Sequence, residues 1–76
     1  MHGFDRITFT PGLMGGRACI RGMRITVSMI VGEIAAGMSF EQLLDDFPEL
    51  EREDIQQALS YAAWRVSERD TPMEAA

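Results

Sequence analysis

The sequence predicts a mainly α-helical fold: a three-helix, helix-turn-helix bundle of the homeodomain-like or winged-helix-like kind, with a short N-terminal β segment. Three observations predict it. Apolar residues recur at helical spacing from residue 27 onward, capping signals divide that region into three helices, and the residues before it alternate between β-forming and glycine-rich pieces. A chain of 76 residues has room for one domain, which we place at residues 7–68. Residues 7–27 form its β segment and basic arm, and residues 28–67 form the three helices.

Three short pieces make up the predicted β segment. Residues 7–10 alternate apolar and polar side chains, and residues 17–20 and 24–27 are two further extended pieces, joined through residues 21–23. Strands this short are not stable alone, so they must lie on the helices or pair with a second copy of the chain. Residues 1–6 before them are predicted to be a flexible N-terminus.

The first helix is predicted to start near residue 28. Thr26 or Ser28 can accept the hydrogen bond that caps its first turn, and Gly37 stands where a helix-ending glycine belongs. The apolar face that defines this helix consists of Val27, Ile30, Val31, Ile34 and Ala35.

The second helix is predicted from its two boundaries. Ser39 and Gln42 have the spacing of a capping box, in which each side chain binds the other residue's backbone N–H. Pro48 cannot continue a helix and stops it. A short connection then leads into the third helix.

The third helix, predicted over residues 50–67, is the longest regular stretch. Its apolar stripe consists of Ile55, Ala58, Leu59, Ala62, Ala63 and Val66. Glu53 and Asp54 fall in its first turn, where the positive end of the helix dipole favours acids. The helix is either the recognition helix of a helix-turn-helix or a central scaffold helix, and the acidic first turn favours the scaffold interpretation. Residues 69–76 are predicted to be a disordered tail.

Charge is divided unevenly along the chain. The formal net charge is −5, yet residues 1–32 hold four arginines against one aspartate, whereas residues 33–76 hold three arginines against eleven acids. An acidic body repels nucleic acid, so any DNA contact has to use the basic front of the chain. The acidic part suits a basic protein partner or solubility.

Size and cysteine usage point to a cytoplasmic homodimer. A domain of this length buries only a small core. It has a single cysteine, Cys19, so no disulfide within the chain can stabilise it. Association with a second copy is therefore the expected source of further burial. A lone cysteine without a signal peptide predicts the cytoplasm. No apolar run approaches the roughly 20 residues of a membrane span.

Several kinds of active site are excluded by residue type. The glycine-rich stretch 12–22 lacks the lysine and hydroxyl of a phosphate-binding loop, and His2 with Cys19 is too few ligands for zinc. Asp45 and Asp46 are adjacent, so they point to different sides of a helix and cannot form a carboxylate dyad. We therefore predict no enzyme, no metal, no cofactor and no small-molecule substrate.

The candidate DNA-binding residues are Arg17, Arg21, Arg24, Arg52 and Gln56. The first three lie within eight positions and could form an arm that contacts phosphates, because guanidinium groups bind phosphate oxygens in pairs. The alternative is that these arginines pair with acids of the same chain or of a second copy. The acids we considered are Glu33, Asp45 and Asp46.

The candidate partner or dimer surface combines apolar residues of the β segment with two aromatic residues of the third helix. Tyr61 and Trp64 flank the apolar stripe, so they lie either at the edge of the core or on a partner surface, where such aromatics are enriched. The full set is Ile7, Phe9, Ile20, Ile25, Tyr61 and Trp64.

Taken together, the motifs resemble the domain-of-unknown-function 433 family, also described as VapB-like antitoxins, over roughly residues 7–63. They are Ile7…Pro11, Gly16–Ile25, Val27, Gly37-Met38-Ser39, Leu43, Phe47–Leu50, Glu53-Asp54-Ile55, Ala58-Leu59 and Tyr61-Ala62. The resemblance implies a dimeric helix-turn-helix antitoxin that binds a PIN-like ribonuclease toxin and operator DNA. The alternative is a small dimeric protein–protein interaction module without DNA binding. Two residues depart from the family pattern: Ala18 replaces a proline, and Glu51 replaces a threonine that often caps the third helix.

Overall fold

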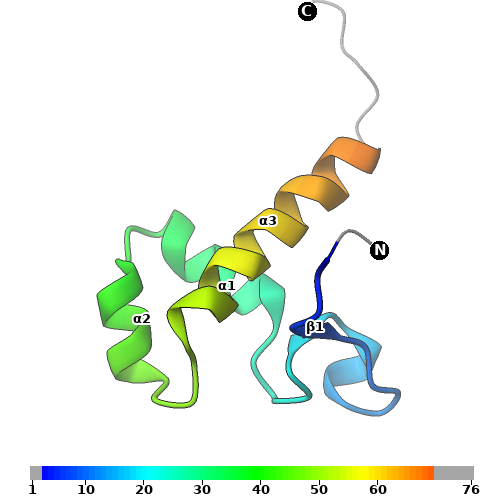
Figure 1. The fold of residues 1–76 in the computed structure, drawn as a ribbon, viewed down its shortest axis with the longest axis horizontal. Helices are drawn as coiled ribbons and strands as arrows, with labels where there is room; N and C mark the ends of the chain where they lie inside the picture. The colour runs from blue at the N-terminus through cyan, green and yellow to red at the C-terminus, as the bar shows by residue number, and fades with distance from the viewer. Residues whose placement is uncertain (1–2, 70–76) are drawn as a thin grey trace, which may run out of the picture.

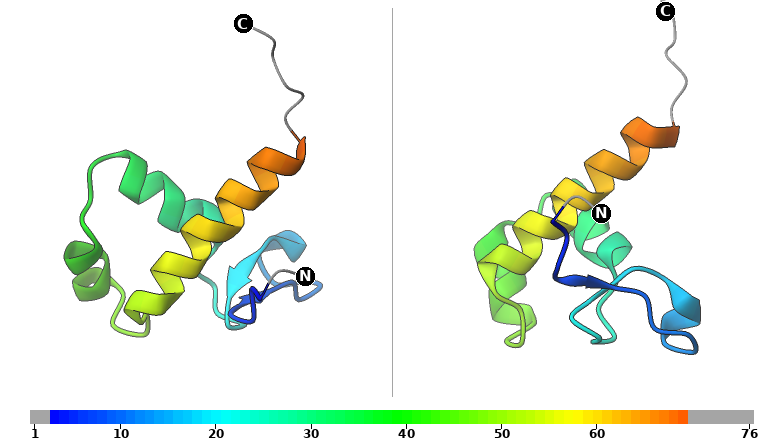
Figure 2. Two further views of the ribbon diagram at one scale, coloured as in Figure 1. Left: turned by 45° about the horizontal axis from the view of Figure 1, so that its top comes forward. Right: turned by 45° about the vertical axis from the view of Figure 1, so that its right-hand side comes forward.

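The computed structural model describes the backbone of residues 3–69 and the side chains of residues 3–67. The elements in chain order are β1 (Ile7–Thr8), a 3₁₀ turn η1 (Met14–Gly16), β2 (Cys19–Ile20), α1 (Val27–Ala35), α2 (Phe40–Asp46) and α3 (Arg52–Arg69). Helix α3 crosses the molecule, with α2 beside its N-terminal half and the β segment on the other side (Figures 1 and 2). Helix α1 packs most extensively against it. The prediction of a mainly helical fold with three helices and a short β segment is confirmed.

The two strands form a small antiparallel sheet. Ile7 lies opposite Ile20, and Thr8 lies opposite Cys19. The first strand is shorter than the predicted range 7–10, because the carbonyl of Thr10 already accepts the backbone hydrogen bond that closes the next turn, at 3.0 Å.

The strand predicted over residues 24–27 is reduced to a single bridge at Thr26, so the predicted length is wrong. Thr26 forms an isolated antiparallel bridge with Cys19, and the Ile20 N–H donates to the Ile25 carbonyl at 2.9 Å, so this piece does line the far edge of β2. The next residue already belongs to α1. Thr26 ends the extended piece because its hydroxyl caps the helix that follows.

The helix boundaries follow the capping chemistry. The Thr26 Oγ1 accepts the Met29 N–H at 3.0 Å, so Thr26 rather than Ser28 is the N-cap of α1. Both hydrogen bonds of the capping box between Ser39 and Gln42 are present, at 3.1 and 2.8 Å. These local bonds fix where α1 and α2 begin.

One core lies between the β segment and the three helices. Its buried members are Ile7, Ile20, Ile25, Val27, Ile30, Leu43, Leu50, Ile55, Ala58 and Tyr61. The thiol of Cys19 is also fully buried. Within the described residues, no helix has the length and hydropathy that crossing a membrane requires.

The N-terminal residues that we expected to be flexible are held on α3 over residues 3–6. The Phe4 ring lies 5.4 Å from the Tyr61 ring, centroid to centroid, and the Arg6 N–H donates to the Gln57 side chain at 2.6 Å. Residues 1–2 and the predicted tail, apart from the helical Arg69, lie outside the described residues.

Candidate functional site

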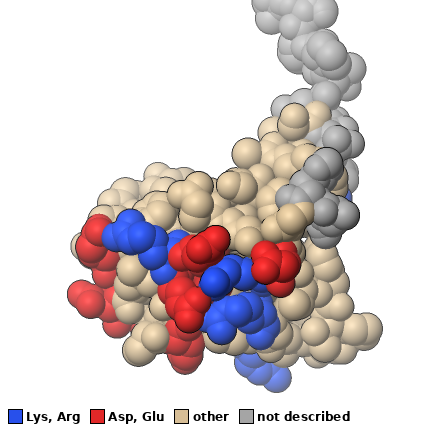
Figure 3. Space-filling model, viewed as in Figure 1, with Lys and Arg blue, Asp and Glu red and all other residues tan. Residues whose placement is uncertain are grey.

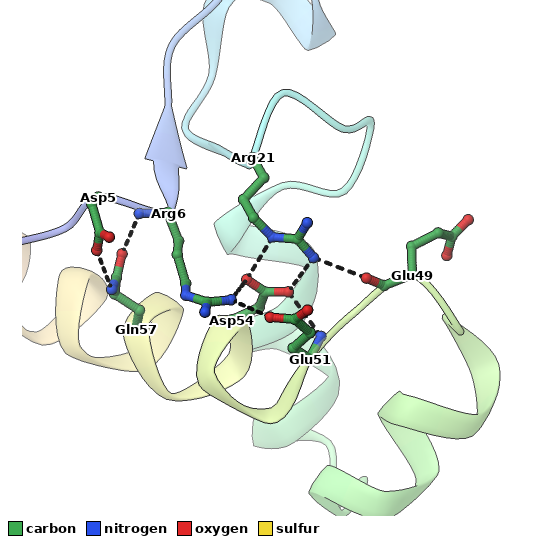
Figure 4. A network of polar contacts seen from close by, with 7 residues as sticks. All are labelled: Asp5, Arg6, Arg21, Glu49, Glu51, Asp54 and Gln57. Atoms are coloured by element: carbon green, nitrogen blue, oxygen red, sulfur yellow. Dashed lines mark hydrogen bonds and ion pairs between the residues drawn. The ribbon is translucent and has the colours of Figure 1, made fainter.

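Two arginines close on one buried carboxylate at the start of α3. The Asp54 side chain is 0% exposed, and its Oδ1 accepts from Arg6 Nη1 at 2.8 Å and from Arg21 Nε at 3.0 Å. Its Oδ2 accepts from Arg21 Nη2 at 2.7 Å and from the Glu51 N–H at 2.8 Å (Figure 4). Both oxygens therefore have two donors each. We refer to Arg6, Arg21 and Asp54 as the arginine clasp.

Local backbone geometry positions each member of the clasp. Asp54 is the third residue of α3, where its carboxylate caps the backbone N–H of the residue before the helix and meets the positive end of the helix dipole. Arg21 has a φ of 46° and Gly22 a φ of 72°, so both residues occupy the left-handed region in a tight turn. That conformation is unfavourable for arginine, and the paired hydrogen bonds to Asp54 help to stabilise it.

Polar groups around the clasp extend it along the start of α3. Arg6 Nη1 also contacts Glu51 Oε1 at 2.7 Å, and Arg21 Nη2 donates to the Glu49 carbonyl at 2.9 Å. Gln57 donates to the Asp5 carboxylate at 3.0 Å. Figure 4 shows that these groups come from the N-terminal segment, the turn after β2, the connection between α2 and α3, and the first turns of α3. The three members of the clasp itself join three parts of the chain.

The clasp keeps Asp54 ionised. Burial alone would raise the pKa of its carboxyl, but hydrogen bonds from Arg21, Arg6 and the Glu51 backbone outweigh this and lower the pKa from 3.8 to about 2. Hydrogen bonds to Glu51 and Asp54 raise the pKa of Arg6. All groups of the clasp are charged near neutral pH and satisfied by one another, so it holds the fold and has no group free for acid–base chemistry.

A second feature is an open groove between the β segment, α1 and the C-terminal half of α3. Its volume is about 470 Å³. The residues that line it are Phe9, Gly16, Arg17, Ala18, Thr26, Val27, Ser28, Val31, Tyr61, Ala62 and Arg65. Most are apolar or small, and Arg17 and Arg65 are the charged members.

A third feature is an acidic corner over α2, the turn after it and the start of α3. Its exposed members are Glu41, Asp45, Asp46, Glu49, Glu51 and Glu53. Figure 3 shows acidic side chains, with arginines between them, gathered over this part of the molecule. The corner is rich in carboxylates, whereas the charged residues that line the groove within residues 3–67 are Arg17 and Arg65.

Comparison with known proteins identifies the family. A model described as "Protein of unknown function (DUF433)" matches residues 7–62. The chain belongs to the DUF433 family. A crystal structure of a DUF433 member from Anabaena variabilis ATCC 29413 is 35% identical, with a TM-score of 0.77, over 83% of this chain and 62% of that one. "Uncharacterized protein y4eO" of Sinorhizobium fredii (strain NBRC 101917 / NGR234) is 38% identical over 56 residues, which are 74% of this chain and 25% of that protein.

The DUF433 chain is thus similar to one part of a longer protein in each comparison. It spans a quarter of the length of y4eO and less than two thirds of the Anabaena chain. The family match includes Arg21 and Asp54 of the clasp, whereas Arg6 precedes it and Arg65 of the groove follows it.

The five candidate DNA-binding residues of this DUF433 protein are not brought together as one surface. Arg21 belongs to the clasp, and Arg52 pairs with Glu41 while its guanidinium lies 5.2 Å from the centre of the Phe40 ring. Arg17 and Gln56 are exposed at different places, the first at the groove and the second on α3.

The fifth candidate, Arg24, is exposed, and its guanidinium Nη1 lies 4.0 Å from the Met14 sulfur. Arg21 is still 37% exposed although its guanidinium is bound to Asp54. Intramolecular pairing, our alternative, is correct for Arg21, but its partner is Asp54 rather than Glu33, Asp45 or Asp46.

The predicted partner surface is wrong for three of its residues. Ile7, Ile20 and Ile25 are buried in the chain's own core, because β2 lies between β1 and the piece before α1 and faces the helices. Of the aromatic residues, Tyr61 is buried and Trp64 is half-buried at the core edge. Phe9 is 50% exposed and lines the groove.

Sequence reasoning missed Arg6 and Asp54 as partners. Arg6 lies in a stretch we expected to be flexible, and the two residues are far apart along the chain. The signal that was available is the acid at the third position of α3, where a carboxylate can reach back to the N-cap backbone. Nothing in the pattern indicates which arginines would reach that carboxylate.

Proposed function

We propose that this DUF433 chain is a protein-interaction module that binds a partner protein rather than DNA. The proposal rests on where the charged side chains lie and what they bind. Two arginines of the basic front are bound to Asp54 in the clasp, and the end of α3 that would have to approach DNA carries the acidic corner.

The argument against DNA follows from helix-turn-helix geometry. If α2 and α3 form such a unit, the N-terminal residues of α3 contact base edges while neighbouring groups approach the phosphates. In this chain, Glu51 and Glu53 are exposed at that end, and Arg52 is paired with Glu41. DNA binding is favourable when cations of the protein neutralise phosphates and displace the counterions that surround the DNA. Carboxylates at this position repel the phosphates and therefore oppose binding.

Exposed apolar surface supports a protein partner. Phe9 and Val66 are 50% and 56% exposed, and Phe9 lies on the groove. Large apolar residues beside a groove are typical of interaction surfaces. Within this proposal, the antitoxin role is the specific case in which the partner is a PIN-like ribonuclease toxin, as the family resemblance implies.

One observation favours a second candidate function, operator binding by a homodimer. Arg17 and Arg24 are exposed, and no carboxylate within residues 3–67 forms an ion pair with either. Two copies related by a two-fold axis would present two such pairs to a two-fold operator.

A DNA titration separates the two functions. We expect no sequence-specific mobility shift with the DNA upstream of the gene, even at low salt. A shift that weakens steeply with salt, disappears in Arg17→Ala plus Arg24→Ala and persists in Arg52→Ala would establish the second candidate and refute the first.

A co-expression experiment tests the antitoxin case directly. The chain is produced together with the product of the adjacent gene, and the mixture is analysed by size-exclusion chromatography. A stable complex with a PIN-like ribonuclease, accompanied by loss of its nuclease activity, is the expected result. Active nuclease that elutes separately from the chain contradicts the antitoxin role.

A further inference from the structure

We propose that the groove between the β segment, α1 and α3 receives an acidic amphipathic helix of a partner protein. This inference rests on the proposed interaction function and names the part of the surface and the chemistry of the partner segment. Helix α1 and the C-terminal half of α3 form two walls of the groove, and a groove between helices suits a third helix that inserts its apolar face.

The floor of the groove is apolar. Phe9 stands at one side with half of its surface exposed, and its ring centre lies 6.1 Å from that of Tyr61 in the floor. Val31 and Ala62, both half-buried, continue the floor along α1 and α3. These side chains can accept one or two large apolar residues of a partner.

The rim of the groove is positive. Arg17 comes from the β segment and Arg65 from α3, and they are the charged residues that line the groove among residues 3–67. Within residues 3–67, neither guanidinium has a hydrogen bond or an ion pair, in contrast to the arginines of the clasp. The first turn of α1, whose end carries positive potential, lies along the same wall.

These charges select an acidic occupant. Carboxylates on both sides of an inserted apolar face can reach Arg17 and Arg65 from opposite sides. The acidic corner lies over a different part of the molecule and repels the same segment, so the groove is the favoured place of contact.

The same charges disfavour a second copy of this chain in the groove. A two-fold interface centred there would bring the Arg17 and Arg65 side chains of both copies together. Four like charges around a shared apolar centre oppose association.

Peptide binding tests the proposal. The probe is a fluorescein-labelled peptide of about 15 residues, near the minimum length for an isolated helix, with leucines on one face and glutamates on both sides of them. Two matched peptides carry lysine for glutamate or serine for leucine. Fluorescence anisotropy measures affinity, and amide chemical shifts locate the contact.

We expect the acidic peptide to bind, to shift the amides of Phe9, Val31 and Ala62, and to bind better than either matched peptide. Arg17→Glu plus Arg65→Glu should weaken it by about tenfold or more, and should improve binding of the lysine peptide. Arg24→Glu, which reverses an exposed arginine outside the groove, should change the affinity by less than about twofold. Circular dichroism checks that each variant is folded.

The proposal is overturned if the acidic peptide fails to bind at millimolar concentration, binds all variants equally, or shifts amides outside the groove. Self-association that protects the groove amides would also overturn it in favour of a second copy. A partner complex that survives Arg17→Glu plus Arg65→Glu refutes the groove but leaves the interaction function intact. DNA binding without any protein partner refutes the interaction function itself.

Discussion

At the scale of single residues, Asp54 has the most demanding environment in the described chain. A carboxylate without solvent contact is unfavourable unless hydrogen bonds replace the lost water, and here four donors do so. Arg21 adopts a left-handed backbone conformation and still directs two of its N–H groups at the same carboxylate. Removal of Asp54 leaves Arg21 without an ion-pair partner among the described residues and leaves Arg6 with Glu51 alone.

Asp54→Asn should therefore lower the free energy of unfolding by about 2–3 kcal/mol, because it removes the charge that binds both arginines. Urea titration followed by circular dichroism measures the loss. Asp45→Asn, an exposed acid on α2, is the control and should change stability by less than about 0.5 kcal/mol. Equal effects of the two substitutions would show that the clasp does not hold the fold.

Asp54 also makes the free energy of unfolding depend on pH in the acid range. The pKa of Asp54 is about 2 in the folded chain, below its ordinary 3.8, so its contribution is fully present above about pH 4 and is lost as the pH falls toward 2. The contribution is on the order of 2 kcal/mol. Stability measured from pH 5 to pH 2 should fall less steeply in Asp54→Asn than in the unmodified chain. Parallel curves would contradict this.

At the scale of elements, the helices could be predicted from the sequence and the β segment only in part. Ser39 and Gln42 specify the start of α2 through contacts three residues apart, and Thr26 specifies α1 in the same way. Such local chemistry is visible in a sequence. The place of Arg6 is not, because its partner Asp54 lies 48 residues away along the chain. From the sequence, the candidate site could be predicted only as a set of arginines. Which of them remain unpaired depends on ion pairs that form only in the folded chain.

Helix α2 offers a matched pair of substitutions. Leu43 is 0% exposed in the core, whereas its neighbour Leu44 is half-buried. Leu43→Ala should cost about 2–5 kcal/mol, because it leaves a cavity among packed side chains. Leu44→Ala should cost less than half as much. Chemical unfolding midpoints measure both, and equal losses would mean that α2 presents a different face to the core.

At the scale of the whole molecule, charge is separated by place. Asp54 of the clasp is buried beneath its two arginines, the acidic corner covers α2 and the start of α3, and the groove with Arg17 and Arg65 opens elsewhere. Figures 1 and 3, seen from the same side, show the charged groups over one part of the fold. This separation is the physical basis for a surface that attracts acidic protein segments in one place and repels them in another.

The clasp also couples distant parts of the chain, which hydrogen exchange can test. Arg6→Ala removes the side chain that ties the N-terminal segment to α3, so the amides of Ile7 and Thr8 should exchange about tenfold faster or more. The amides of α2 should change little, because α2 makes no hydrogen bond to Arg6 among the described residues. A uniform acceleration over the whole chain would show that the segment opens only when the entire fold does.

The separation in sequence between Arg6 and its partners has a consequence for biosynthesis. Strand β1 leaves the ribosome before α3, because Glu51, Asp54 and Gln57 are translated some fifty residues later. Until then, the edge of β1 and the guanidinium of Arg6 have no native contact with α3. The contacts of β1 and Arg6 with α3 therefore wait for α3 to emerge, and truncated nascent chains that stop before Glu51 expose the edge of β1 to chaperones and proteases.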